Sequence, residues 1–200
     1  MKEIYLCRHG RTQWNDERKI QGRTDIPLNE TGIFQAQALS QFLYSCSPKA
    51  DLIVCSPMMR ARQTAEPIAK ALGLEIVIDE DITEVDTGEY TGQSMVELNK
   101  DPTWLAHIAD PFVTGYGPYG ESSESVRNRV MRAIDKYNHA IFVTHASPIR
   151  HAILALLDIP TKHMYHLAIH NASASCIEIH ADFAKLVFMN HTTCATIQHH

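Results

Sequence analysis

Short apolar segments alternate along the chain with longer segments of helical periodicity, and this alternation limits the folds that the chain can adopt. The apolar segments have the length of strands and lie at residues 4–7, 52–55, 74–78 and 140–144. The helical segments lie at residues 32–43, 56–73, 122–137 and 147–157. Strands that alternate with helices favour a mostly parallel sheet with helices on both faces. We therefore predict an α/β fold, a three-layer sandwich formed by one domain over residues 1–200.

Apolar spacing and capping residues give more detailed predictions for the helices. The spacing within 32–43 predicts a buried helical face made of Ile33, Ala36, Leu39 and Leu43. Ser56 and Ser147 each precede a proline, a pair that is typical of an N-cap followed by the first helical residue. Residues 175–181 and 185–191 are further strand candidates, which we expect to pair at the edge of the sheet.

Residues 101–121 do not fit the alternation, because they are rich in proline, glycine and ring-bearing side chains. The rings belong to Trp104, His107, Phe112, Tyr116 and Tyr119. One interpretation is a surface loop packed by its own aromatic residues, and the other is a lid over a binding site. Both stay open, and we describe the segment as a lid-like excursion whose aromatic residues are candidates for contacts with a leaving group.

Composition argues against several kinds of partner and location. The formal net charge is −5, so we predict no binding to nucleic acid or to an anionic membrane. No apolar run approaches the ~18 residues that a membrane span requires. Five widely spaced cysteines, Cys7, Cys46, Cys55, Cys176 and Cys194, predict reduced thiols in a cytoplasmic protein. The sequence leaves the oligomeric state open, with a homodimer as one alternative.

Polar residues follow three of the predicted strands. They are Arg8, His9 and Gly10 after residues 4–7, Ser56 and Arg60 after residues 52–55, and Thr144 and His145 at the end of residues 140–144. Ligands of open α/β sheets bind beyond the carboxyl ends of the strands. Two predicted helices also start there, and helix N-termini favour anions. With two arginines suited to phosphate oxygens, the sequence predicts a phosphate site at this edge.

His9 differs from the other histidines of the chain in its setting. An arginine precedes it, a glycine follows it, and a strand ends at it. Gly10 would permit a tight turn and a close approach of the backbone to a ligand. Because an imidazole held against a bound phosphoryl group is a competent nucleophile, His9 is our candidate for that role.

Six segments, in order, carry a resemblance to a known family. They are "RHGRTQWN", "QGRTDIPLNETG", "SPMMRARQTA", "ITEVDTGEYTG", "GESSESVRNRV" and "FVTHASPIR". Together they resemble the histidine phosphatase superfamily, the phosphoglycerate mutase-like proteins, and "ITEVDTGEYTG" is similar to its phosphatase branch. There are two departures, since Arg11 stands where family members usually show Glu or Gln, and Ala146 replaces a glycine that often follows the second histidine.

The resemblance implies a role for each matching residue. His9, Glu84 and His145 would be catalytic, and Arg8, Asn15, Gln21, Gly22 and Arg60 would bind the substrate. His9 would accept the phosphoryl group, and Glu84 would act first as general acid and then as general base. No metal and no cofactor is implied. The function would be that of a phosphomonoesterase acting on a small phosphorylated metabolite, of the broad-specificity, sugar-phosphate or alpha-ribazole type. The alternative is a cofactor-dependent phosphoglycerate mutase.

Three other functions are less well supported by the residues. Asp79 and Asp81 resemble the nucleophile motif of haloacid dehalogenases, but no convincing acidic pair follows for the metal. Cys55 and Arg60 are one residue too close for the loop of thiol phosphatases. A phosphate-sensing module without activity could have lost His9 or Glu84, and both are present.

Overall fold

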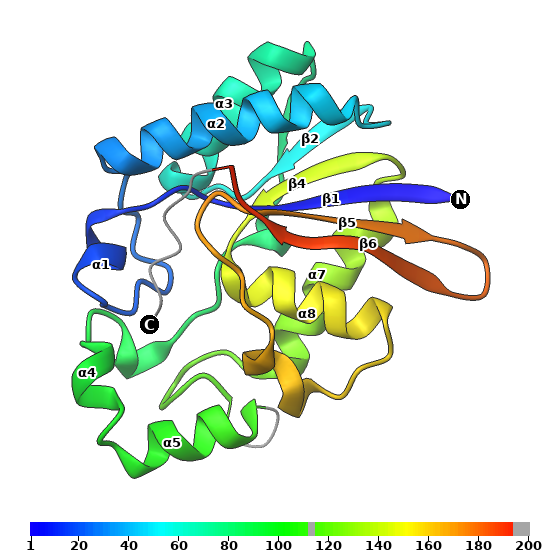
Figure 1. Ribbon diagram of the computed structural model, residues 1–200. Helices are drawn as coiled ribbons and strands as arrows, with labels where there is room; N and C mark the ends of the chain where they lie inside the picture. The colour runs from blue at the N-terminus through cyan, green and yellow to red at the C-terminus, as the bar shows by residue number, and fades with distance from the viewer. Residues whose placement is uncertain (112–114, 194–200) are drawn as a thin grey trace.

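A six-stranded sheet forms the centre of the molecule, and its strands follow the order β3-β2-β4-β1-β5-β6 (Figure 1). The computed structural model describes residues 1–111 and 115–193. The strands are β1 (Lys2–Arg8), β2 (Leu52–Cys55), β3 (Ile76–Ile78), β4 (Ala140–Thr144), β5 (Ala174–Ile179) and β6 (Ala184–His191). Strands β1 to β4 are parallel, β5 is antiparallel to β1, and β6 is antiparallel to β5. The expected pairing of the last two strands is confirmed.

Helices cover both faces of the sheet (Figure 1). Helices α2 (Glu30–Cys46) and α3 (Met59–Leu72) pack on one face, and α7 (Ser123–Lys136) and α8 (Ala146–Leu156) pack on the other. Side chains of a strand point alternately to the two faces. On β4, Ile141 and Val143 belong to the core under α2 and α3, whereas Phe142 belongs to the core under α7 and α8. The predicted three-layer α/β sandwich is confirmed.

Short helices extend the fold beyond the edge where the parallel strands end (Figure 1). They are α1 (Gln13–Asp16), α4 (Met95–Leu98) and α5 (Pro102–Ala109), and further 3-10 helices are η1 (Glu80–Ile82), η2 (Gly88–Tyr90) and η3 (Thr161–His166). The excursion at 101–121 therefore contains a helix. In it Trp104, His107 and Tyr116 are buried and Tyr119 is 91% exposed, while Phe112 lies outside the described residues.

One predicted buried residue and several predicted boundaries are wrong. Ile33 is exposed, and Gly32 takes its place on the buried face of α2. Helix α3 begins at Met59 rather than near Ser56, because the N–H of Ser56 still bonds to Val143 O of the neighbouring strand. Helix α8 begins at Ala146, with His145 rather than Ser147 as its N-cap. Strand β3 is also shorter than the segment at 74–78.

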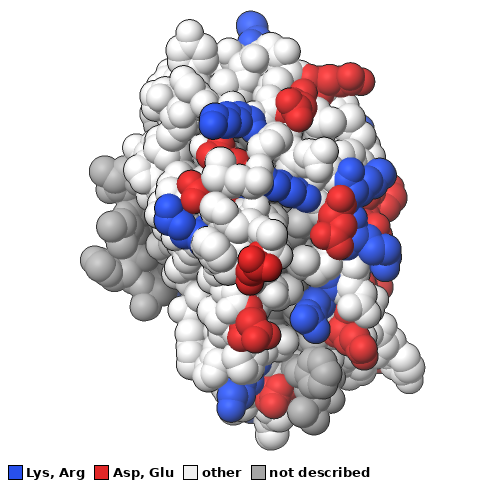
Figure 2. All heavy atoms as spheres, turned by 90° about the vertical axis from the view of Figure 1, so that its right-hand side faces the viewer, with Lys and Arg blue, Asp and Glu red and all other residues white. Residues whose placement is uncertain are grey.

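Charged side chains of both signs are interspersed on the face of the molecule that Figure 2 shows, where the parallel strands begin. That face therefore presents no broad basic surface of the kind that binds nucleic acid. None of the helices among the described residues has a stretch long and apolar enough to cross a membrane.

Candidate active site

His9 is held at the end of β1 by backbone bonds to two neighbouring segments. Its N–H donates to Thr144 O of β4 at 3.0 Å, and its carbonyl accepts from the N–H of Ala172 at 3.0 Å. Its ring Nδ1 lies 2.6 Å from Gly10 O. Because a carbonyl oxygen only accepts, Nδ1 carries the hydrogen, and the lone pair of neutral His9 is at Nε2.

The environment of His9 keeps its imidazole neutral. The side chain is 2% exposed. Burial, followed by the charges of Arg60 and Arg8, holds the pKa of His9 well below its usual value. Neutral imidazole has a free lone pair, so His9 is in the form that can act as a nucleophile.

Gly10 packs closely against helix α2. A Cβ at this position would lie 2.5 Å from Gly32 O at the start of α2. The structure thus gives a further reason for the glycine, beside the tight turn and the close approach to a ligand that the sequence predicts. Gly10 lets helix α2 approach the turn that follows β1, and this contact helps to fix the carbonyl that orients His9.

His145 lies beside His9 because β1 and β4 are neighbours that end at the same level. Arg8 pairs with Thr144 in the register, so the two histidines follow adjacent strand ends. Their ring centroids are 5.1 Å apart. His145 Nε2 lies 2.8 Å from Ser56 Oγ, and its buried Nδ1 has no hydrogen-bond partner among the described residues. Burial, and then the charge of Arg60, keep the pKa of His145 well below its usual value.

Backbone carbonyls hold two arginines beside the histidines, the buried Arg60 and the half-buried Arg8. Arg8 Nη1 donates to Ile169 O at 2.6 Å. Arg60 donates to Thr24 O at 2.8 Å and to Gly22 O at 2.9 Å. These acceptors carry no net charge, so both guanidinium charges stay available for an anionic ligand.

Only one of the two predicted helix N-termini faces the site. Ala146 and Ser147, the first residues of α8, line the cavity described below. At the start of α3, the N–H of Met59 instead donates to Asp25 Oδ1 at 2.6 Å. The prediction that α3 directs free N–H groups at the ligand is wrong, because a carboxylate of the chain already occupies that position.

The remaining predicted residues come from loops. Asn15 belongs to a capping box of α1, and its Oδ1 accepts from Asn171 Nδ2 at 3.2 Å. Gln21 is nearly buried, and its Oε1 has no hydrogen-bond partner among the described residues. Gly22 has a positive φ of 48°, and its carbonyl anchors Arg60. Glu84 accepts from its neighbour's N–H, Val85 N, at 2.9 Å.

A cavity of about 330 Å³ brings these residues together. Seven of the eight predicted site residues line it, namely Arg8, His9, Asn15, Gln21, Gly22, Arg60 and Glu84. The eighth, His145, is fully buried behind this lining. Trp104, Ile108 and Tyr116 of the excursion also line the cavity, so part of that segment faces the site.

The sequence-based prediction did not assign a role to four other residues of this region. Arg150, Tyr165 and Lys19 line the cavity, and Asn171 donates to His9 O at 3.2 Å. A signal existed only for Arg150, because it follows Ala146 by one helical turn and must therefore lie on the same face of α8.

Arg11, the residue that departs from the family pattern, does not line the cavity. Its guanidinium forms an ion pair with Asp16, and its backbone N–H donates to Gln35 Oε1 at 2.9 Å. The charge of Arg11 is therefore compensated at the surface, outside the site.

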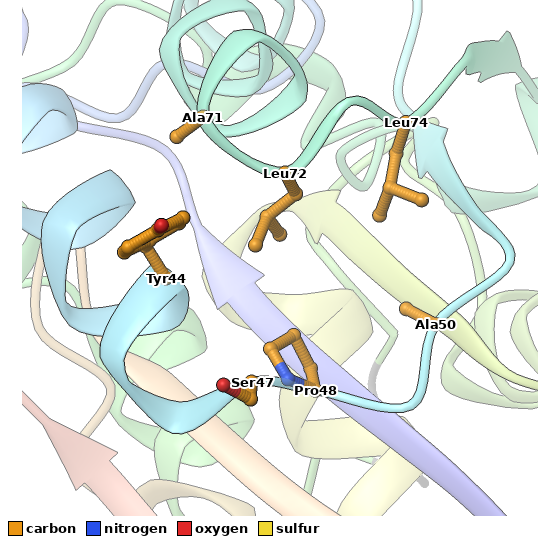
Figure 3. Close-up of a pocket in the computed structure, with 7 residues that line it drawn as sticks. All are labelled: Tyr44, Ser47, Pro48, Ala50, Ala71, Leu72 and Leu74. Carbon is orange, nitrogen blue, oxygen red and sulfur yellow. The ribbon is translucent and has the colours of Figure 1, made fainter.

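A second cavity of about 340 Å³ lies between the C-terminal ends of α2 and α3 (Figure 3). Leu72, Leu74 and Pro48 point toward one another there. Its lining, Tyr44, Ser47, Pro48, Ala50, Ala71, Leu72 and Leu74, holds no charged side chain. The two cavities have nearly the same volume, so their chemistry distinguishes them, and only the first suits a phosphate ester.

Asp79 and Cys55, the nucleophile candidates of the two rival phosphatase chemistries, both lie away from the cavity. Asp79 accepts from Lys136 Nζ at 3.0 Å and from Tyr137 OH at 2.9 Å. Cys55 is buried in the core, and burial raises the pKa of its thiol to about 12. Neither residue lines the arginine-containing cavity, so neither is placed to attack a phosphate bound there.

The chain resembles known proteins over nearly its whole length. A Hydrogenobacter thermophilus protein provisionally named phosphoserine phosphatase 2 is 33% identical, over 95% of this chain and 96% of that protein. A Proteus mirabilis protein provisionally named phosphoglycerate mutase GpmB is 30% identical, over 89% of this chain and 85% of that protein. The structure of Entamoeba histolytica phosphoserine phosphatase in complex with 3-phosphoglyceric acid superimposes with a TM-score of 0.85, at 27% identity, over 96% of this chain and 98% of that one.

The family assignment rests on a match to residues 4–192, which include every predicted site residue. The resemblance noted in the sequence and the fold expected from it are both confirmed. The chain belongs to the histidine phosphatase superfamily, branch 1.

Proposed function

We propose that this chain is a phosphatase, a phosphomonoesterase that works through a phosphohistidine at His9. One observation carries the proposal most directly. His9 Nδ1 is tied to Gly10 O at 2.6 Å, which leaves Nε2 as the free nitrogen beside a cavity that Arg8 and Arg60 also line. The phosphatase name of relatives at 33% and 27% identity supports the same reaction class.

In the first step, His9 Nε2 attacks phosphorus and the bond from phosphorus to the ester oxygen breaks. Glu84 donates its proton to the departing oxygen, so the alcohol leaves neutral and Glu84 becomes a carboxylate. In the second step, Glu84 takes a proton from water, and the resulting hydroxide oxygen attacks phosphorus. The bond from phosphorus to Nε2 breaks, which releases phosphate and returns His9 and Glu84 to their initial forms.

The positive charge for these steps would come from protein groups, so we propose a metal-independent reaction without a cofactor. The two arginines are anchored before the substrate binds, so little reorganisation is needed as charge develops on the phosphoryl oxygens. His145 Nδ1, which has no partner among the described residues, is a further donor candidate for those oxygens.

The relative named as a phosphoglycerate mutase makes phosphoryl transfer between organic molecules the alternative reaction. A mutase would use the same phosphohistidine, but would return the phosphoryl group to an organic acceptor instead of to water. Both reactions need His9, and they differ in the molecule that accepts the phosphoryl group from it.

We also propose a small phosphorylated metabolite as substrate and the cytoplasm as location. The cavity volume suits a small molecule. Cys7, Cys46, Cys55 and Cys176 are free thiols, as expected in a reducing compartment, and Cys194 lies outside the described residues.

The test is the release of p-nitrophenol from p-nitrophenyl phosphate in EDTA by wild type, His9→Ala and the exposed control His166→Ala. We expect activity in EDTA that is lost in His9→Ala alone, together with an acid-labile phosphoryl label on wild type that His9→Ala lacks. Activity that requires magnesium and survives His9→Ala would overturn the proposal. Transfer of the label to glycerate phosphates in preference to water would identify a mutase.

A further inference from the structure

Arg150 is a second cationic feature of the cavity, distinct from the pair beside His9. It lies on α8 one turn after Ala146, and both residues line the cavity. Nothing in the proposed phosphoryl transfer uses it. An arginine that faces a ligand cavity and has no task in the chemistry is a candidate for recognising the rest of the substrate.

The guanidinium of Arg150 is held in place by its surroundings. Its Nε donates to Leu167 O at 3.0 Å, two residues before the carbonyl of Ile169 that anchors Arg8. Its Cζ lies 5.5 Å from the ring centroid of Tyr165. The Tyr165 hydroxyl is in turn 2.6 Å from His107 Nε2 of α5. Because the side chain of Arg150 is already ordered, it loses little additional rotamer entropy when it binds an anion.

Among the described residues, no carboxylate compensates the charge of Arg150. No acidic residue in the described ranges forms an ion pair with it, whereas Lys19, also on the cavity, pairs with Glu17 at 2.8 Å. Its effect extends to the phosphoryl site, since burial, and then the charge of Arg150, lower the pKa of Arg8 to about 10. The cavity therefore holds more positive charge than the phosphoryl group needs.

The charges of the cavity lining indicate which anionic group the substrate carries in addition to its phosphoryl group. Arg8, Arg60 and Arg150 contribute three positive charges to the lining, and the charge of Lys19 is compensated by Glu17. In the proposed mechanism Glu84 keeps its proton, and therefore has no charge, until the ester oxygen leaves. A phosphomonoester carries about two negative charges at neutral pH. One positive charge is left over, which a single carboxylate would match and a second phosphate group would exceed.

We propose that Arg150 binds a carboxylate on the leaving group, so that the substrate is a phosphorylated carboxylic acid. This inference rests on the proposed phosphatase function and adds the substrate class to it. Arg8 and Arg60 would bind the phosphoryl oxygens, and Arg150, stacked on Tyr165, would determine specificity.

The test compares esters that differ in the carboxylate. O-phosphoserine and O-phosphoethanolamine form one pair, and 3-phosphoglycerate and glycerol 3-phosphate form the other. We expect wild type to prefer the acid in at least one pair by about 10- to 100-fold in kcat/KM, the worth of one hydrogen-bonded charge pair. In Arg150→Met this ratio should fall to near one. If the substitution also affects the phosphoryl-transfer step, it changes kcat/KM for both esters of a pair, and this change cancels in their ratio.

The control is Arg127→Met, which removes an exposed arginine of α7 and should keep the wild-type ratio. The inference is overturned if wild type prefers neither acid, including the case in which it hydrolyses p-nitrophenyl phosphate alone. It is also overturned if Arg150→Met lowers both members of a pair equally, because Arg150 would then serve the phosphoryl group.

A binding measurement separates this inference from the proposed function. Calorimetry with His9→Ala gives Kd values for O-phosphoserine and O-phosphoethanolamine without turnover, and the same measurement is made with His9→Ala/Arg150→Met. A preference for the acid that disappears in the double variant supports the carboxylate site even if wild type hydrolyses no ester, an outcome that would reject only the phosphatase. Equal Kd values in His9→Ala would reject the carboxylate site even where hydrolysis is observed.

Discussion

The hydroxyl of Ser56 lies 2.8 Å from Nε2 of His145 and links the end of β2 to the start of α8. Ser56 Oγ also accepts from the N–H of Met58 at 3.4 Å. The hydroxyl can donate its hydrogen to Nε2, and neutral His145 then carries its ring hydrogen on Nδ1. In this arrangement Ser56 leaves Nδ1 of His145 to donate to a bound phosphoryl group.

Replacement of Ser56 by alanine should reduce both activity and stability. We expect kcat/KM for p-nitrophenyl phosphate to fall by about tenfold, and the free energy of unfolding to fall by about 1–3 kcal/mol, because Nε2 is left buried without a partner. Enzyme assays and urea denaturation measure the two effects. The exposed control Ser45→Ala should match wild type in both. Unchanged kinetics in Ser56→Ala would mean that His145 needs no orientation by Ser56.

Replacement of Glu84 by glutamine should affect poor leaving groups most. An alkyl phosphate needs a proton on its departing oxygen, whereas p-nitrophenolate leaves readily without one. We expect kcat to fall by about 10²- to 10⁴-fold for an alkyl phosphate and by much less for phosphoryl transfer from p-nitrophenyl phosphate. Pre-steady-state assays of the two substrates give the comparison, with the exposed Glu89→Gln as control. Equal losses for both substrates would argue against Glu84 as the general acid.

Two glycine substitutions separate steric from conformational effects. In Gly10→Ala the new methyl group would lie 2.5 Å from Gly32 O, so the turn or α2 must move. In Gly73→Ala nothing lies within 4 Å, and the cost comes only from the φ of 68°. We expect a loss of about 1–3 kcal/mol in the free energy of unfolding for Gly10→Ala and about 1 kcal/mol for Gly73→Ala. Urea denaturation tests this, and only Gly10→Ala should also lose activity.

The protein should lose stability as the pH falls from 7 to 5. Burial lowers the pKa of His107 to about 4 and that of His151 to about 4. Between those values and the ordinary pKa of about 6.5, the unfolded chain binds protons that the folded protein does not. Each residue then removes roughly 2 kcal/mol of stability by pH 5. Urea denaturation at both pH values measures the loss.

His151→Gln tests the assignment of that pH dependence, because it removes one of the titrating groups. The variant should lose less stability than wild type over the same pH range, and the exposed control His166→Gln should lose as much as wild type. A wild-type stability that does not change between pH 7 and pH 5 would contradict the prediction.

Trp104 and Tyr116 should influence which esters are preferred. Both line the cavity, and Trp104 packs edge to face on Tyr90 with centroids 5.4 Å apart. In Trp104→Leu and Tyr116→Leu, we expect the ratio of kcat/KM for p-nitrophenyl phosphate to that for glycerol phosphate to change by about tenfold, because an aromatic leaving group loses an aromatic contact. Unchanged ratios in both variants would reject contacts between the excursion and the leaving group.

The sequence determined that the sheet is mostly parallel, and it identified seven of the residues that line the cavity. Apolar segments of strand length that alternate with helices favour a parallel sheet. In such a sheet, residues that follow neighbouring strands meet at one edge. Arg8 and His9 could therefore be placed near His145 without coordinates. Residue identities at six ordered segments then added Glu84 and the loop residues through the family resemblance.

Only the tertiary structure decided the details that depend on contacts between distant segments. The sequence contains no signal that Gly10 packs on Gly32, that Asp25 caps α3 or that Tyr165 lies under Arg150. Such contacts are set by how whole elements pack, and a local pattern reports only on its own element. The protonated nitrogens of His9 and His145 have the same origin. The carbonyl of Gly10 selects the nitrogen in His9, and the hydroxyl of Ser56 is the partner that folding brings to His145.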